Sequence, residues 1–173
     1  MSSLTAFTVL IAVVAVERLL ELRLSRRNVE AQMAAGGIEV GMGHYPVMVA
    51  LHVGLLAGCL LESWLLHRPF VPVLGYPMLG LVLCAAAGRF WVISALGDRW
   101  TTRVVVVPGL AKVRRGPYRF MSHPNYLIVA VEGFALPLVH TNWITAAVFT
   151  VLNGVLLAVR IRVENRALAG AGT

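Results

Sequence analysis

A polar stretch that begins at Gly116 contains the residues of this chain best suited to chemistry. It reads Gly-Pro-Tyr-Arg-Phe-Met-Ser-His-Pro-Asn-Tyr and lies between two strongly apolar regions. Its two prolines fix their own φ angles and restrict the residues before them, so we expect one bent shape. The side chains that this shape would present together are those of Tyr118, Arg119, His123, Asn125 and Tyr126. The plain alternative is a polar turn between two membrane helices.

The composition is that of a protein embedded in a membrane. Of the 173 residues 58% are hydrophobic and 13% are charged, and the mean hydropathy is +0.78. A soluble domain of this size is less apolar. The formal net charge of +7 could indicate a nucleic-acid partner. Because the charges lie in short loops between apolar runs, they favour a role in membrane orientation, and we expect no nucleic-acid partner.

The chain shows no spacing typical of a metal site. Cys59 and Cys84 both lie in apolar runs and form neither a disulfide framework nor a metal motif. His44 and His52 share a helix face eight residues apart, but no third ligand lies near them in the sequence. We therefore expect no bound metal.

Five apolar runs predict an all-α integral membrane fold with about five transmembrane helices. The predicted helices cover residues 4–24, 46–66, 73–96, 125–139 and 143–161. The fourth would be about 22 Å long, less than a hydrocarbon core of about 30 Å. The last two would form a helical hairpin. We expect one domain over residues 1–173, in which residues 1–96 hold the first three helices and residues 97–173 hold a cofactor-binding loop, the hairpin and the tail.

Two of the segments that connect the predicted helices also have recognisable patterns. Residues 23–45 are polar and rich in glycine, and they predict a short amphipathic helix followed by a loop. The run of valines over residues 104–107, followed by Pro108 and Gly109, predicts a short strand and a turn.

Charged residues inside the apolar runs are costly to bury, so each needs an explanation. Arg18 and Glu21 can meet at a spacing of three residues. Arg89 is expected to pair with a carboxylate of the first helix or to extend toward the interface. Glu132 lies two turns into the fourth helix, where it could act as a general base or substrate anchor, or could pair with Arg89 or Arg160.

The basic residues predict the orientation. Twelve of them follow the first, third and fifth helices, and Arg68 is the only one in the other loops. The positive-inside rule places the twelve in the cytosol. The polar stretch and the tail would then meet at the cytosolic face, where Arg160 and Glu164 share one side of the last helix.

With both segments in view, the chain resembles the isoprenylcysteine carboxyl methyltransferase family. The match runs from Leu96-Gly97 through Gly116-Pro117-Tyr118-Arg119 and His123-Pro124-Asn125-Tyr126 to Arg160-Ile161, Glu164 and Leu168, about the last 80 residues. The stretches Gly36-Gly37-Ile38-Glu39 and Gly43-His44-Tyr45-Pro46 resemble a bacterial branch of the family, some members of which methylate hydroxyls of alkylresorcinols and alkylpyrones. The sequence departs from the family pattern at Leu110, Ser122 and Asn165, where the family commonly has His, Arg and Glu.

The resemblance implies S-adenosylmethionine as the methyl donor and assigns roles to individual residues. The cofactor-binding candidates are Tyr118, Arg119, His123, Pro124, Asn125, Tyr126, Arg160 and Glu164. The catalytic candidates, which follow from the residues themselves, are Glu132 and His123; a structural histidine bonded to a loop carbonyl is the alternative for His123. We place the substrate near His44, Tyr45 and Arg103.

The expected function is methyl transfer to a lipophilic acceptor, for which we favour a hydroxyl of an alkylresorcinol or alkylpyrone. Carboxyl methylation of an isoprenylcysteine-like substrate is the first alternative. A sterol-type membrane reductase and a non-catalytic membrane scaffold are more remote. We expect an integral protein of a bacterial inner membrane, in contact with membrane lipid and with a cytosolic C-terminus. The sequence leaves its oligomeric state open.

The charge distribution generates a first prediction. A topology reporter fused after Thr173 and a second one inserted near Gly109 should both give cytosolic signals, because both positions lie on the arginine-rich side. An external signal from either reporter would show that the orientation is wrong. A reporter inserted beside Arg68 serves as the control and should give the opposite signal.

Overall fold

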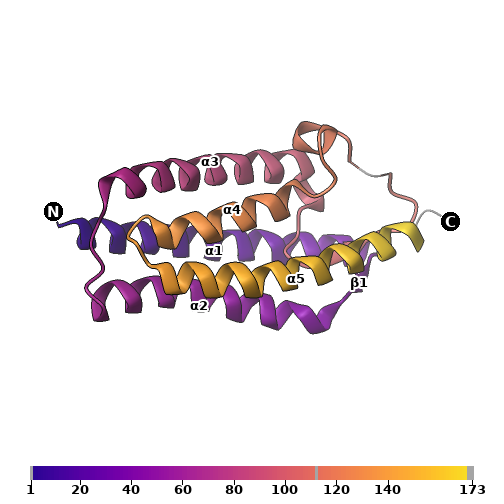
Figure 1. Ribbon diagram of the computed structural model, residues 1–173. Helices are drawn as coiled ribbons and strands as arrows, with labels where there is room; N and C mark the ends of the chain where they lie inside the picture. The colour runs from indigo at the N-terminus through magenta and orange to yellow at the C-terminus, as the bar shows by residue number, and fades with distance from the viewer. Residues whose placement is uncertain (1, 112, 171–173) are drawn as a thin grey trace.

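The computed structural model describes residues 2–111 and 113–170, and α-helices dominate this part of the chain (Figure 1). The helices are α1 (Ser3–Ala34), α2 (Tyr45–Leu65), α3 (Pro72–Leu96), α4 (Pro124–Leu138) and α5 (Trp143–Gly170). Three single-turn 3-10 helices join them: η1 (Met42–His44), η2 (Gly97–Arg99) and η3 (Gly116–Arg119). The strands β1 (Ile38–Val40) and β2 (Val104–Val106) complete the fold.

Four helices in the described part of the chain, α1, α2, α3 and α5, are long and apolar enough to cross a membrane. Their outward faces carry large apolar side chains that a soluble bundle would hide, such as Val13, Leu61, Phe90 and Val151. The protein is therefore an integral membrane protein. Helix α4 has 15 residues and is shorter than a span, so a fifth crossing stays a prediction.

The helices pack around a small apolar core. Helix α4 packs against α3 and α5, α2 packs against α5, and α1 packs against α2. Phe7, Leu55, Cys59, Leu136 and Phe149 belong to the core cluster. The two chain ends lie at opposite ends of the bundle, and the strand β1 lies at the same end as the C-terminus (Figure 1).

The first helix is longer than its apolar run indicated. We predicted an end near residue 24 and a separate amphipathic helix, but α1 continues unbroken to Ala34. Its polar extension binds the loop after α3. The Asn28 amide donates to the carbonyl oxygens of Trp100 at 2.8 Å and Gly97 at 3.2 Å, and Ser25 Oγ accepts the Thr102 backbone N–H at 2.9 Å. These bonds to buried backbone groups hold the extension as one helix.

A two-stranded ribbon joins the two halves of the chain. The strand predicted over residues 104–107 is confirmed as β2, at Val104–Val106. Its antiparallel partner β1 comes from the stretch predicted as a loop, and Glu39 lies opposite Val105. Two short runs far apart in sequence form the ribbon, so local pattern alone could not reveal β1.

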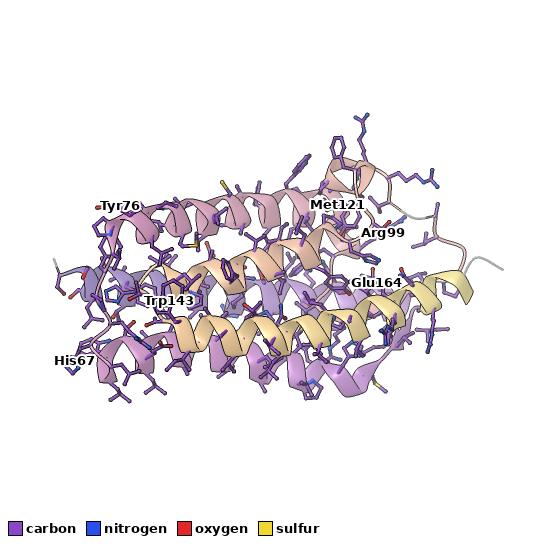
Figure 2. The ribbon with its side chains drawn as sticks, viewed as in Figure 1. His67, Tyr76, Arg99, Met121, Trp143 and Glu164 are labelled. Atoms are coloured by element: carbon purple, nitrogen blue, oxygen red, sulfur yellow. The ribbon has the colours of Figure 1, made fainter. Side chains whose placement is uncertain are left out.

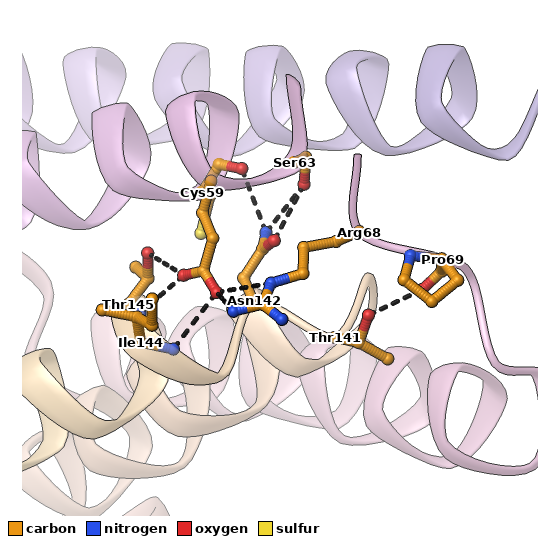
Figure 3. Close-up of polar contacts among 9 residues, drawn as sticks. Cys59, Ser63, Arg68, Pro69, Thr141, Asn142, Ile144 and Thr145 are labelled. Carbon is orange, nitrogen blue, oxygen red and sulfur yellow. Dashed lines mark hydrogen bonds and ion pairs between the residues drawn. The ribbon is translucent and has the colours of Figure 1, made fainter. Parts of the chain in front are cut away.

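A polar cluster fixes the beginning of α5 at the end of the bundle opposite β1 (Figure 3). The Glu62 carboxylate on α2 accepts the backbone N–H groups of Ile144 at 3.2 Å and Thr145 at 2.8 Å, together with the Thr145 hydroxyl. Arg68 forms an ion pair with the same carboxylate at 2.9 Å. A carboxylate at a helix N-terminus satisfies free N–H groups and interacts favourably with the helix dipole. Glu62 therefore caps α5 from a neighbouring helix.

Close packing of α4 on α5 generates a second prediction. A Cβ atom added to Gly133 would lie 2.0 Å from the Phe149 ring, whereas one added to Gly154 would meet nothing within 4 Å. Gly133→Ala should therefore destabilise the protein by about 1–3 kcal/mol through overpacking. Gly154→Ala, the matched control, should be neutral or slightly stabilising because alanine favours helix. Thermal unfolding in detergent measures both variants, and equal midpoints would contradict the packing.

Candidate functional site

A large cavity opens at the end of the bundle that carries most of the arginines. Its volume is about 780 Å³, within the usual range for small-molecule sites. Figure 2 shows Arg99, Met121 and Glu164 at this end and His67, Tyr76 and Trp143 at the other. The sequence-predicted residues that line the cavity are Arg103, Tyr118, Arg119, His123, Asn125, Tyr126, Arg160 and Glu164. The bent polar segment and the tail of α5 therefore meet here.

The bend before the cavity depends on Gly116. Its φ of +57° favours glycine, and an added Cβ would lie 2.8 Å from the Ala95 Cβ and 3.2 Å from the Trp91 Nε1. Arg115 Nε donates to the Ala95 carbonyl at 2.7 Å, which anchors the segment on the end of α3. Pro117, which follows, is buried. Pro124 is also buried, begins α4 and is not among the cavity-lining residues.

Helix α5 brings two acceptor groups to the polar segment. The Tyr126 hydroxyl donates to the Glu164 carboxylate, and His123 stacks on the Tyr126 ring with centroids 5.4 Å apart. His123 Nε2 lies 3.1 Å from Asn165 Oδ1, and Nδ1 lies 3.7 Å from Glu164 Oε1. Asn165, a position at which the sequence departs from the pattern of the family it resembles, thus contacts the predicted histidine directly. Helix α5 reaches these contacts because it continues nine residues beyond its predicted end at residue 161.

Arg160 is buried at the cavity wall but does not form an ion pair with Glu164 within the described residues. Its guanidinium donates to the Thr102 carbonyl at 2.7 Å, contacts Met48 Sδ, and lies 5.4 Å from the centre of the Tyr126 ring. A buried guanidinium held mainly by neutral partners keeps its positive charge available for an anionic ligand.

The Tyr118 side chain is a neutral hydrogen-bonding group in this cavity. Burial raises the pKa of its phenol well above the usual value, and the nearby Glu164 carboxylate raises it further. The hydroxyl therefore stays protonated at neutral pH and can donate a hydrogen bond or present its ring face to a cation.

Of the three predicted substrate-binding residues, His44, Tyr45 and Arg103, only Arg103 lines the large cavity. Arg103 lines the cavity, forms an ion pair with Glu39 at 3.1 Å and lies 4.6 Å above the centre of the Tyr45 ring. Tyr45 therefore contacts a cavity-lining residue without lining the cavity itself. His44 and Tyr45 are not among the cavity-lining residues; an added Cβ on Gly41 would lie 2.3 Å from the His44 ring.

Glu132 lies in a second polar site, deeper in the bundle. It forms an ion pair with Arg89, and its other oxygen lies 3.6 Å from Arg18. Glu21 completes the network, 2.9 Å from Arg18 and 3.5 Å from Arg89. These four side chains from α1, α3 and α4 carry two positive and two negative charges. The expected Arg18–Glu21 contact and the pairing of Arg89 with a helix-1 carboxylate are both confirmed.

A small cavity of about 20 Å³ adjoins this network and is lined by Arg18, His52 and Glu132 among apolar side chains. It is large enough for one water molecule. Arg18 Nε is buried and lacks a hydrogen-bond acceptor within the described residues. Glu132 lines this small cavity and is absent from the lining of the large one.

Several cavity-lining residues were not predicted from the sequence. The wall includes apolar side chains from the end of α3 and from the loop around β2, namely Leu96, Trp100, Val104, Val105, Val106, Val107, Leu110 and Val113. The valine run was visible in the sequence, but only the structure shows that it lines the cavity. Asn28 and Ser25, which hold this wall, share one face of α1, and that spacing was the available signal.

Fold and site together define a helical membrane protein with a polar, arginine-rich cavity of cofactor size. The model of the isoprenylcysteine carboxyl methyltransferase (ICMT) family matches residues 78–170. An uncharacterized protein of Bacillus subtilis strain 168, YpbQ, is 36% identical over 163 residues, which cover 94% of this chain and 96% of the relative. An uncharacterized protein of Haemophilus influenzae Rd is 27% identical over 155 residues, 88% of each chain. No solved structure matches the chain.

The chain belongs to the isoprenylcysteine carboxyl methyltransferase family, whose members are S-adenosylmethionine-dependent membrane methyltransferases. The matched region begins in α3 and contains the polar segment, α4 and α5. Helices α1 and α2, which supply Arg18 and Tyr45, and strand β1, which supplies Glu39, lie before it.

The buried network generates a third prediction. Arg89→Gln removes a positive charge and leaves Glu21 and Glu132 with Arg18 alone. A partner lost from a buried ion pair costs about 3–5 kcal/mol, so the melting temperature in detergent should fall strongly. Arg23→Gln, which removes an exposed arginine of α1, is the control and should have little effect.

A double variant makes this test sharper. Arg89→Leu combined with Glu132→Leu removes one charge of each sign and leaves the Arg18–Glu21 pair. Because a buried pair can be replaced by apolar residues at little cost, the double variant should be more stable than Arg89→Leu alone. Additive losses would show that charge balance does not govern this site.

Proposed function

We propose that this protein transfers the methyl group of S-adenosylmethionine to a lipophilic acceptor at the cytosolic face of a bacterial inner membrane. The carrying observation is the cavity of about 780 Å³ that gathers the family-implied residues of the polar segment, α4 and α5. The acceptor that we favour is a hydroxyl of an alkylresorcinol or alkylpyrone. The proposed orientation, with a cytosolic C-terminus, rests on the arginines at this end of the bundle.

The donor groups around the cavity fit the chemistry of this cofactor. Its carboxylate requires a cation, which Arg160 and Arg119 can provide. Its ammonium and sulfonium charges suit the Glu164 carboxylate and the faces of Tyr118 and Tyr126. Asn125 Oδ1 is buried and lacks a donor within the described residues. When bound, S-adenosylmethionine supplies an electrophilic methyl group on a good leaving group.

The protein itself must align the two reactants, exclude water and remove a proton from the acceptor. Transfer to a hydroxyl forms an O–C bond and breaks the S–C bond, and the hydroxyl proton must leave. If the Nε2–H of His123 donates to the Asn165 side-chain oxygen, Nδ1 carries the free lone pair that can accept the hydroxyl proton. The Glu164 carboxylate, 3.7 Å away, would stabilise the imidazolium formed. We therefore propose His123 as the proton acceptor in the large cavity.

Glu132 remains the second candidate base, but its contacts favour a structural role. Its ion pairs with Arg89 and Arg18 support the alternative that it is a structural partner. It lies seven residues beyond Asn125, about 10 Å along α4. A lipophilic acceptor arriving from the bilayer would have to displace these arginine contacts to use it.

Carboxyl methylation of an isoprenylcysteine-like substrate is a second candidate, favoured by the family itself. A carboxylate acceptor is already ionised at neutral pH and needs no base. Arg103, half exposed at the cavity, could bind such a carboxylate.

Binding of the product analogue provides a fourth prediction. His123→Ala and Glu164→Ala should each weaken S-adenosylhomocysteine binding about tenfold or more, since a lost charge-assisted hydrogen bond costs about 1.5–3 kcal/mol. Isothermal titration of the purified protein measures this affinity. Glu30→Ala, which removes an exposed carboxylate of α1, is the matched control and should bind normally. Unchanged affinity in both folded variants would remove His123 and Glu164 from the cofactor site, and NADPH binding instead would favour a reductase.

The base provides a fifth prediction. With an alkylresorcinol acceptor, His123→Asn should slow methyl transfer by about 10²–10⁴, and higher pH should restore part of the rate because the phenol then ionises without help. Glu132→Gln should lower the melting temperature clearly and should change the rate of methyl transfer at saturating cofactor only slightly. If Glu132→Gln remains stable and loses the rate instead, with cofactor binding intact, the roles are reversed. Transfer to a prenylcysteine but not to the phenol would identify the carboxyl alternative.

A further inference from the structure

The segment that forms one wall of the large cavity also presents an outer surface. Tyr118, Ser122 and His123 line the cavity, and Pro117 is buried beneath them. Between them, Phe120 is 74% exposed and Met121 is 42% exposed. A single short turn therefore separates the cavity from two large, exposed apolar side chains.

This outer surface lies beside a membrane-spanning helix. Arg115 bonds to the Ala95 carbonyl, and Gly116 packs against Ala95 and Trp91 on the last turns of α3. Trp91 is itself exposed, and Figure 2 shows Met121 at this end of α3. The segment thus folds back along the end of a span and does not project beyond it. If α3 crosses the bilayer, its last turn, and with it Phe120 and Met121, would lie where acyl chains give way to headgroups.

Three exposed arginines belong to the same segment as the apolar pair. They are Arg114, Arg115 and Arg119, and none forms an ion pair with a carboxylate in the described part of the chain. The Arg119 guanidinium lies 5.7 Å from the centre of the Phe120 ring. Apolar side chains flanked by arginines are typical of surfaces that bind a bilayer containing anionic lipids.

We propose that residues 114–121 dock on the anionic headgroup layer of the surrounding bilayer. Phe120 and Met121 enter the acyl boundary, and Arg114 and Arg115 bind lipid phosphates, while Arg119 stays available to the cavity. Because Tyr118 and Arg119 belong to the same turn, this contact orders the cavity wall and strengthens cofactor binding. That last step rests on the proposed function, whereas the docking itself does not. An acidic soluble protein would also attract the arginines, but it would leave Phe120 in contact with water or with protein.

Depth measured with a spin label tests the docking. A nitroxide on Phe120→Cys is examined in lipid vesicles, with Cys84→Ser removing the exposed native thiol and Cys59 remaining buried. Val13→Cys, lipid-facing on α1, and Ala35→Cys, exposed after α1, are the two references. The label at position 120 should collide with oxygen like the Val13 label and should be shielded from a water-soluble nickel chelate. Collisions like those of the Ala35 label would overturn the docking.

Lipid composition tests the coupling to the cavity. In vesicles with about one third phosphatidylglycerol, S-adenosylhomocysteine should bind about threefold or more tightly than in pure phosphatidylcholine. Raising NaCl from about 50 to about 500 mM should remove this gain. Equal affinity in both lipids would overturn the coupling. Absence of binding in either lipid would instead contradict the proposed function, while the spin-label depth would still decide the docking.

Discussion

Four charges in the interior of the bundle, of which Arg89 and Glu132 are buried, must stay together and so hold the register of this molecule. Arg18, Glu21, Arg89 and Glu132 lie in membrane-embedded helices, where a charge without a partner is very costly. Their mutual pairing therefore prevents α1, α3 and α4 from sliding past one another.

This register is transmitted to the cavity through rigid helices. Ser25 lies seven residues after Arg18 on α1, and Asn125 lies seven residues before Glu132 on α4, so each is about 10 Å from the network along its own helix. Ser25 holds the loop after α3, and Asn125 lines the cavity. A polar network in the bundle interior thus sets the distance between opposite walls of the site.

A second constraint acts from the other end of the bundle. Glu62 fixes the first turn of α5, and Asn142 bonds to the Cys59 carbonyl and to Ser63 on α2 (Figure 3). Glu164 lies twenty residues beyond Ile144, about 30 Å along the helix axis. Anchoring the beginning of α5 therefore aims Arg160 and Glu164 at the polar segment, and a helix without this cap could rotate them out of the cavity.

Much of the fold and the site followed from the amino-acid sequence alone. The long apolar runs could only be membrane helices, because a bilayer forces each backbone group to bond within its own helix. The bent segment from Gly116 to Tyr126 was recognisable because proline and glycine act locally on the backbone. The tertiary structure decided what depends on contacts between distant residues. It decided that α1 continues to Ala34, because the helix is held there by backbone groups of the loop at Trp100, and that Glu39 belongs to a strand, because its partner lies more than sixty residues away. It also placed Glu132 with Arg89, since the sequence shows that a buried carboxylate needs a partner but only the packing of helices selects which one.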